Sequence, residues 1–110
     1  MALPRLLSWW QRRSSRRLEH LQILLYTRQG CHLCEDAWRL LEQEQQRYHF
    51  TLSAVDIDSD PGLKARYGEL VPVVVINGKE RFRGGVNRAL LSRQLLAEAT
   101  RSDQSRGTGR

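Results

Sequence analysis

The sequence of this 110-residue chain predicts an α/β fold, built as a four-stranded mixed sheet with helices on both faces. Short apolar runs alternate with helical patterns along residues 21–99, as in sheets that are covered by helices. One helical pattern lies between the first two strand patterns, so these strands should be parallel with a right-handed crossover. Asn77-Gly78 separates the last two strand patterns and favours an antiparallel hairpin. The predicted order is strand, helix, strand, helix, hairpin, helix.

The first strand, helix and second strand are predicted from apolar spacing. Residues 22–26, QILLY, form a short apolar run typical of a strand buried on both faces. After Gly30, apolar residues recur at helical spacing from Leu33, and Glu35 and Asp36 suit the positive end of the helix dipole. Residues 50–55, FTLSAV, alternate as a second strand does. The apolar stripe of the predicted helix comprises Leu33, Ala37, Trp38, Leu40 and Leu41.

The second half of the chain begins with a short predicted helix over residues 61–67. Asp60 fits its N-cap, Pro61 its first position and Gly68 the position after its end. The hairpin strands are expected at about residues 72–76 and 80–83, around Asn77-Gly78. Five apolar residues support a closing helix over about residues 86–98, namely Val86, Ala89, Leu90, Leu95 and Leu96.

The charge of the chain separates its ends from its middle. Residues 1–20 hold five Arg and one Glu, and residues 100–110 hold three Arg and one Asp, whereas residues 21–99 hold ten basic and ten acidic side chains. The net charge of +6 therefore belongs to the ends and indicates no specific nucleic-acid partner for the middle. We predict a basic N-terminal extension (1–20), one domain (21–99) and a disordered tail (100–110).

The N-terminal extension leaves the destination of the protein open. Leu3, Leu6, Leu7 and Trp10 are spaced as in an amphipathic helix, which would rest weakly on an anionic membrane. The abundance of Arg and Ser also fits an organelle-targeting sequence, and a loosely ordered terminus is the third reading. Two cysteines do not make a secreted disulfide scaffold, and no apolar run reaches the length of a membrane span. The expected location is cytoplasmic, with organelle targeting as the alternative.

The stretch QGCHLCED, residues 29–36, holds both cysteines of the chain, Cys31 and Cys34. Residues three apart in a helix share a face at a spacing that a disulfide can bridge. The pair also lies where the first strand gives way to a helix, and the helix N-terminus lowers a thiol pKa to about 7 or below in such motifs. Arg28 adds a nearby positive charge. We expect Cys31 to attack a disulfide and Cys34, one turn further in, to resolve the product.

Other uses of the two cysteines remain open but fit less well. A zinc site needs about four ligands, and none of His20, His32 and His49 shows a paired ligand spacing. Haem attachment needs a His directly after the second cysteine, and this position holds Glu35. Two structural thiols, or zinc shared by two chains, are the remaining readings. His32, between the sulfurs, is either an exposed spacer or a charge that favours the thiolate. No metal site is predicted within one chain.

Four elements in order make the chain resemble a glutaredoxin-like member of the thioredoxin superfamily: YTRQGCHLC, DIDSDP, VPVVVING and the pair Gly84-Gly85. The resemblance implies the thioredoxin-like fold, with Cys31 as nucleophile, Cys34 as resolving thiol and Pro72 in the cis form. It also implies a substrate or glutathione site, whose expected residues are Arg28, Val71, Pro72, Gly84, Gly85 and Asn87. In this site the backbone of Val71 would pair with a substrate peptide or glutathione, and Arg28 would meet the glutathione carboxylate.

The chain departs from the usual glutaredoxin pattern at two places. His32-Leu33 stands where that family usually has Pro-Tyr between the cysteines. Val86, Asn87 and Arg88 follow the glycine pair, where an acidic residue usually holds the glutathione amino group. Asn87 can accept a hydrogen bond there but carries no charge.

These observations predict a thiol–disulfide oxidoreductase that reduces protein disulfides or glutathione mixed disulfides through its dithiol. No tightly bound cofactor is expected. Glutathione is a candidate co-substrate, and either glutathione or a thioredoxin-reductase system would be the reductant. The alternative is a non-catalytic thioredoxin-fold binding module, or an iron–sulfur cluster carrier in which two chains each contribute Cys31.

Overall fold

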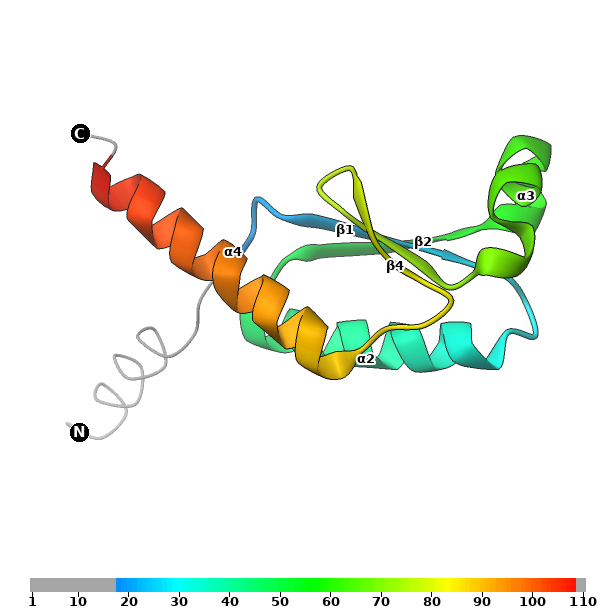
Figure 1. Cartoon of the computed structure of the whole chain (residues 1–110), viewed down its shortest axis with the longest axis horizontal. Helices are drawn as coiled ribbons and strands as arrows, with labels where there is room; N and C mark the ends of the chain where they lie inside the picture. The colour runs from blue at the N-terminus through cyan, green and yellow to red at the C-terminus, as the bar shows by residue number, and fades with distance from the viewer. Residues whose placement is uncertain (1–17, 109–110) are drawn as a thin grey trace, which may run out of the picture.

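The computed structural model describes residues 18–108 of the chain, with side chains described as far as Arg101. Its strands form one sheet in the order β2-β1-β3-β4 (Figure 1). Strand β1 runs parallel to β2 and antiparallel to β3, and β3 pairs antiparallel with β4. The elements in chain order are β1 (Gln22–Thr27), α2 (His32–Tyr48), β2 (Thr51–Asp56), the short 3₁₀ helix η1 (Ile57–Ser59), α3 (Pro61–Tyr67), the 3₁₀ helix η2 (Gly68–Leu70), β3 (Val73–Ile76), β4 (Lys79–Arg83) and α4 (Arg88–Thr108).

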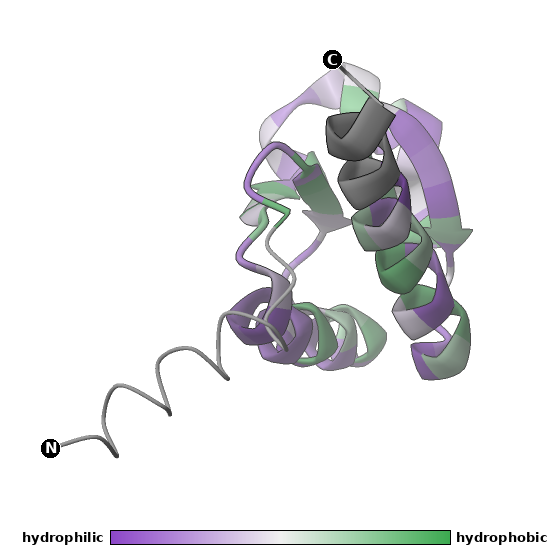
Figure 2. Cartoon of the chain, turned by 90° about the vertical axis from the view of Figure 1, so that its left-hand side faces the viewer, coloured by the Kyte–Doolittle hydropathy of each residue, from purple (hydrophilic) through white to green (hydrophobic). Residues whose placement is uncertain are grey.

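Helices α2 and α4 pack on the same core of the sheet; in Figure 1, α2 and the first part of α4 lie below the strands, and α4 continues to the upper left. In Figure 2, α2 and the coloured part of α4 each carry both green and purple segments, and some of their apolar side chains face the core. Helix α2 buries Ala37 and Leu41, and α4 buries Leu91 and Leu95, each pair four residues apart. These side chains pack on alternate residues of the strands, which supply Ile23, Leu25, Val74, Ile76 and Phe82 to the same core.

The opposite face of the sheet holds a smaller core beside α3. Ile57, Tyr67 and Val73 are buried there, and partly buried apolar side chains of the neighbouring segments surround them. The rings of Tyr26 and Tyr67 stack with centroids 4.6 Å apart, which joins β1 to α3. Helix α3 stands at one end of the sheet in Figure 1. The predicted mixed sheet with helices on both faces is therefore confirmed.

The capping residue of α3 and the turn residues between β3 and β4 predicted these elements correctly. Asp60 caps α3, its carboxylate accepting hydrogen bonds from the N–H groups of Gly62 and Leu63, and the helix spans residues 61–67 as expected. Asn77 and Gly78 both have positive φ, at 49° and 83°, as a two-residue type I′ hairpin turn requires. The strands lie within one or two residues of their predicted bounds.

The two ends of the predicted domain differ from the structure. Leu18, which we assigned to the extension, is fully buried, and its N–H donates to the carbonyl of Tyr48 at 2.6 Å. The extension therefore ends before Leu18, because this residue belongs to the core. Helix α4 continues to Thr108, so residues 100–108, expected to be disordered, are helical. Ala99 is still buried and Arg101 pairs with Glu98 at 2.5 Å, which supports the helix beyond residue 98.

The amphipathic pattern of Leu3, Leu6, Leu7 and Trp10 lies outside the described residues. Among the helices that the structure describes, none is both long and apolar enough to cross a membrane.

Candidate functional site

Three loops converge at one end of the sheet. Tyr26, near the end of β1, pairs with Val73, the first residue of β3, and Val73 in turn pairs with Arg83, the last residue of β4. The loop with the two cysteines follows β1, the Val71-Pro72 segment precedes β3, and the glycine pair follows β4. The sheet therefore brings together the three segments that carry the predicted site residues.

Cys31 is the N-cap of α2 and has an extended backbone, with φ −98° and ψ 105°. Its Sγ accepts a hydrogen bond from the N–H of Cys34 at 3.2 Å, and its carbonyl accepts one from the N–H of Glu35 at 3.1 Å. A sulfur in this position takes the place of the Ser or Asp oxygen that usually caps a helix. The first turn of α2 thus directs its N–H groups and the positive end of its dipole toward Cys31.

Cys34 lies one turn further along α2 and is buried, with 1% of its surface exposed. It forms a disulfide with Cys31, and their Cα atoms are 5.2 Å apart. This distance lies in the ordinary range for a disulfide. Cys31 is half-buried and Cys34 is covered, so only the first sulfur is open to an incoming reactant.

The two residues between the cysteines project outward. The His32 side chain is 95% exposed, and its Nδ1 lies 3.9 Å from a carboxylate oxygen of Glu35. Leu33 is 56% exposed and Leu70, just before the Val71-Pro72 segment, is 37% exposed. His32 is therefore a surface side chain, and the border of the disulfide includes exposed apolar groups.

The peptide bond between Val71 and Pro72 is cis, as the resemblance implied. Pro72 is buried and Val71 is half-buried. The carbonyl of Pro72 accepts a hydrogen bond from the N–H of Gly84 at 2.8 Å. Gly84 has φ +82°, which favours glycine, whereas Gly85 has an ordinary φ. The glycine pair thus holds the chain against the proline segment.

Arg28 is tied to the segment between β2 and β3. Its Nε and Nη2 donate to the carboxylate of Asp58 at 3.2 and 3.0 Å, and its Nη1 donates to the carbonyl of Gly68 at 3.1 Å. Lys64 Nζ lies 3.9 Å from the same carboxylate. The predicted anion-binding residue is therefore already engaged with a carboxylate of the chain itself. Sequence reasoning did not find this partner, which is 30 residues away along the chain.

Asn87 has a structural contact of its own. Its Oδ1 accepts a hydrogen bond from the N–H of Leu90 at 3.0 Å, which caps the first turn of α4. The acceptor atom that we assigned to substrate is thus used inside the chain. The binding roles of Arg28, Val71, Pro72, Gly84, Gly85 and Asn87 stay predictions.

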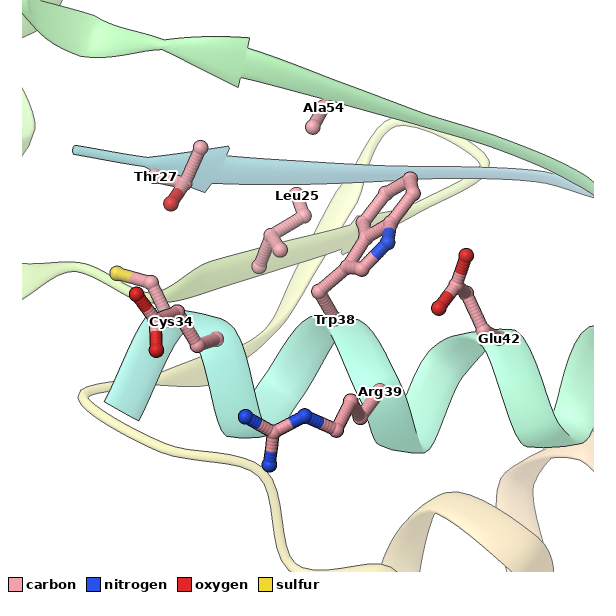
Figure 3. Close-up of a pocket in the computed structure, with 8 residues that line it drawn as sticks. Leu25, Thr27, Cys34, Trp38, Arg39, Glu42 and Ala54 are labelled. Carbon is pink, nitrogen blue, oxygen red and sulfur yellow. The ribbon is translucent and has the colours of Figure 1, made fainter. Parts of the chain in front are cut away.

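A pocket of about 460 Å³ lies beside the buried cysteine, between α2 and the sheet (Figure 3). Its lining residues come from α2, β1 and β2: Leu25, Thr27, Cys34, Glu35, Trp38, Arg39, Glu42 and Ala54. Sequence reasoning used Trp38 only as an apolar residue of the helix and did not single out Glu42. Their spacing of four residues could have indicated that they share a helix face.

No group of three or more His, Cys, Asp and Glu side chains is arranged to hold a metal ion among the described residues.

Residues 22–96 match the family model described as the glutaredoxin-like domain (DUF836). The chain belongs to this family. The matched residues of this glutaredoxin-like chain run from β1 into α4, so they include the sheet and the cysteine loop described above.

Two solved structures resemble the glutaredoxin-like chain in both sequence and fold. A structural-genomics target protein from X. campestris is 32% identical, with a TM-score of 0.56, and the match covers 68% of this chain and 96% of that one. A protein from Nitrosomonas europaea is 28% identical, with a TM-score of 0.59, and the match covers 67% and 89%. Oxidised thioredoxin from Plasmodium falciparum shares the fold, at a TM-score of 0.54, 20% identity and coverages of 84% and 91%.

A curated relative is an uncharacterized protein of Mycobacterium tuberculosis. It is 33% identical over 64 residues, which are 54% of this chain and 66% of the relative. The match thus spans slightly less than two thirds of that protein. With the family and the neighbours, the geometry identifies a glutaredoxin-like domain of thioredoxin fold that carries a redox-type cysteine pair.

Proposed function

We propose that this glutaredoxin-like protein is a thiol–disulfide oxidoreductase in which Cys31 attacks and Cys34 resolves. The proposal rests on one observation above all. The half-buried Cys31 sulfur caps α2 and accepts the N–H of Cys34, whereas the Cys34 sulfur is covered. A thiolate at a helix N-terminus is stabilised by the N–H groups and the dipole, so the exposed cysteine is the better nucleophile.

The first step transfers substrate to Cys31. In the reduced protein, the Cys31 thiolate attacks one sulfur of a substrate disulfide, and a new S–S bond forms to that sulfur. The substrate S–S bond breaks, and its other sulfur leaves as a thiolate that takes a proton from water. The leaving thiolate carries away the electron pair of the broken bond.

The second step releases the substrate and closes the disulfide seen in the structure. The Cys34 thiol gives its proton to water, its thiolate attacks Cys31 Sγ, and the remaining substrate sulfur leaves as a thiolate that takes a proton from water. The substrate has then gained two electrons and the protein has lost two. An external thiol, either glutathione or a dithiol of a thioredoxin-reductase system, must reduce the Cys31–Cys34 disulfide before the next turnover.

We propose protein disulfides as the main substrates. The exposed apolar side chains Leu33 and Leu70 border the cysteine pair and the Val71-Pro72 segment, and they offer a polypeptide apolar contact. Arg28, the predicted partner of the glutathione carboxylate, has its guanidinium bound to Asp58 and Gly68. Glutathione would have to compete with Asp58 for this cation.

The test is an assay of disulfide reduction with two reductants, glutathione with its reductase and thioredoxin reductase with NADPH. We expect wild-type protein to reduce a protein disulfide such as insulin, and Cys31→Ser to lose this activity with both reductants. The Cys34→Ser variant should accumulate a mixed disulfide between Cys31 and the substrate. Equal slow rates for wild type and Cys31→Ser would contradict the proposal. Iron and sulfide added anaerobically to wild type serve as a second arm, because a stable visible chromophore would favour the cluster carrier instead.

A further inference from the structure

The two edges of the sheet differ in how they are protected. Strand β4 has four charged residues among its five, and the β3–β4 pairing contains an irregularity between Val74 and Val75. Charges and bulges of this kind keep other strands from adding to an edge. Strand β2 has neither a Lys nor a Pro, and its one charged residue, Asp56, is its last. In the described part of the chain, β2 pairs with β1 alone, so its outer row of N–H and C=O groups is an open edge.

The pocket beside Cys34 adjoins this open edge. Ala54 of β2 is exposed and forms one wall, the half-buried Trp38 supplies further apolar surface, and the buried Leu25 lies at the floor. Ala54 pairs with Leu25, so both side chains point to the α2 side of the sheet. A side chain on an added strand, pointing to the same side, would enter the pocket from the edge.

The polar groups of the pocket favour a cation. Figure 3 shows Trp38 and Glu42 rising from α2 toward the strands. The two residues are four apart on the helix, which places the indole and the carboxylate on one face. An indole face and a carboxylate both attract ammonium or guanidinium groups. Arg39 also lines the pocket, but its guanidinium is paired with Asp36 at 3.4 Å.

We infer that β2 accepts an extended peptide of a protein partner, and that the pocket takes a basic side chain of this peptide. The main chain would add to the open edge of β2, its basic side chain would lay its apolar stem against Ala54 and Trp38, and its cation would meet Glu42. Strand addition gives affinity through main-chain hydrogen bonds, and a side-chain pocket gives specificity. This docking surface does not depend on the thiol chemistry, because neither sulfur reacts in it.

The test is an NMR titration of full-length, oxidised, ¹⁵N-labelled protein with a capped pentapeptide, Thr-Val-Lys-Val-Thr. We expect the indole N–H of Trp38 to shift and amides of β2 to exchange more slowly with solvent, whereas amides of β4 stay unchanged. A matched peptide with norleucine in place of Lys keeps the apolar stem and removes the charge. It should bind about fivefold more weakly.

Two variants separate the pocket from general charge effects. Glu42→Gln should bring the affinity for the Lys peptide down to that for the norleucine peptide. Glu80→Gln removes the same charge from the opposite edge strand and should leave the fivefold preference intact. Three outcomes would overturn the inference: no shift at millimolar peptide, equal binding of both peptides to wild type, or shifts confined to β4. Protection of β2 that rises with protein concentration without peptide would also overturn it, because a second copy would then occupy the edge.

Discussion

The backbone N–H of Cys34 lies 3.2 Å from the Sγ of Cys31 and donates a hydrogen bond to it. This contact makes the first cysteine the cap of the helix that carries the second. In this turn Cys34 is buried, whereas Cys31 is half-buried.

Asp58 is predicted to limit the use of anionic disulfides. The Asp58→Asn change removes the carboxylate that holds Arg28 but keeps the size of the side chain. We expect kcat/KM for the anionic reagent dithiobis-nitrobenzoate to rise about two- to fivefold relative to neutral dithiodipyridine, because the freed guanidinium attracts the substrate carboxylate. The gain should shrink at high salt. Equal changes for both reagents would mean that Arg28 does not meet substrate charge.

Leu18 is predicted to be part of the folding unit. Its side chain is fully buried among core residues, so Leu18→Ala should lower the free energy of unfolding by about 2–5 kcal/mol. Urea denaturation followed by circular dichroism measures this loss. Leu96→Ala is the matched control, since Leu96 is 49% exposed and its truncation should cost less than about 0.5 kcal/mol. A neutral Leu18→Ala would return residue 18 to the extension.

Gly84 and Gly85 form a matched pair for a test of backbone strain. A Cβ at either glycine meets no atom within 4 Å, but only Gly84 has a positive φ, at +82°. We therefore expect Gly84→Ala to destabilise the protein by about 1–2 kcal/mol and Gly85→Ala to change stability much less. Thermal and urea unfolding of both variants give the comparison. Similar losses for the two variants would be inconsistent with the backbone described for Gly84.

Asn87 is predicted to act as the cap of α4. The Asn87→Ala variant loses the hydrogen bond to the N–H of Leu90 and should lose about 1 kcal/mol of stability, whereas Asn87→Asp keeps the acceptor. Measured KM values decide whether this residue also binds substrate. A capping role alone predicts an unchanged KM for the disulfide substrate in Asn87→Ala, assayed well below its unfolding transition, and a severalfold rise would restore the binding role implied by the family resemblance.

Sequence patterns predicted elements whose signals are local. Asp60-Pro61 and Asn77-Gly78 each prescribe a backbone geometry within a few residues, and the helix and hairpin there match the structure. Two hydrogen-bonded contacts, Leu18 with Tyr48 and Arg28 with Asp58, each join residues 30 apart along the chain. The spacing of apolar residues along the sequence does not predict such contacts. The pocket at Trp38 needs three elements in place at once. The position of the cysteine pair at the start of a helix was thus readable from the sequence, but the contacts around the pair were not.

The order of reactivity of the two thiols tests the central claim most directly. Fully reduced protein is treated with a limiting amount of iodoacetamide at several pH values, and the modified cysteine is identified by mass spectrometry. We predict that Cys31 is alkylated first, with a rate whose pH midpoint lies below the ordinary thiol value of about 8.5, because its thiolate is stabilised by the start of α2. Preferential alkylation of Cys34, or equal rates with ordinary midpoints for both, would contradict the account.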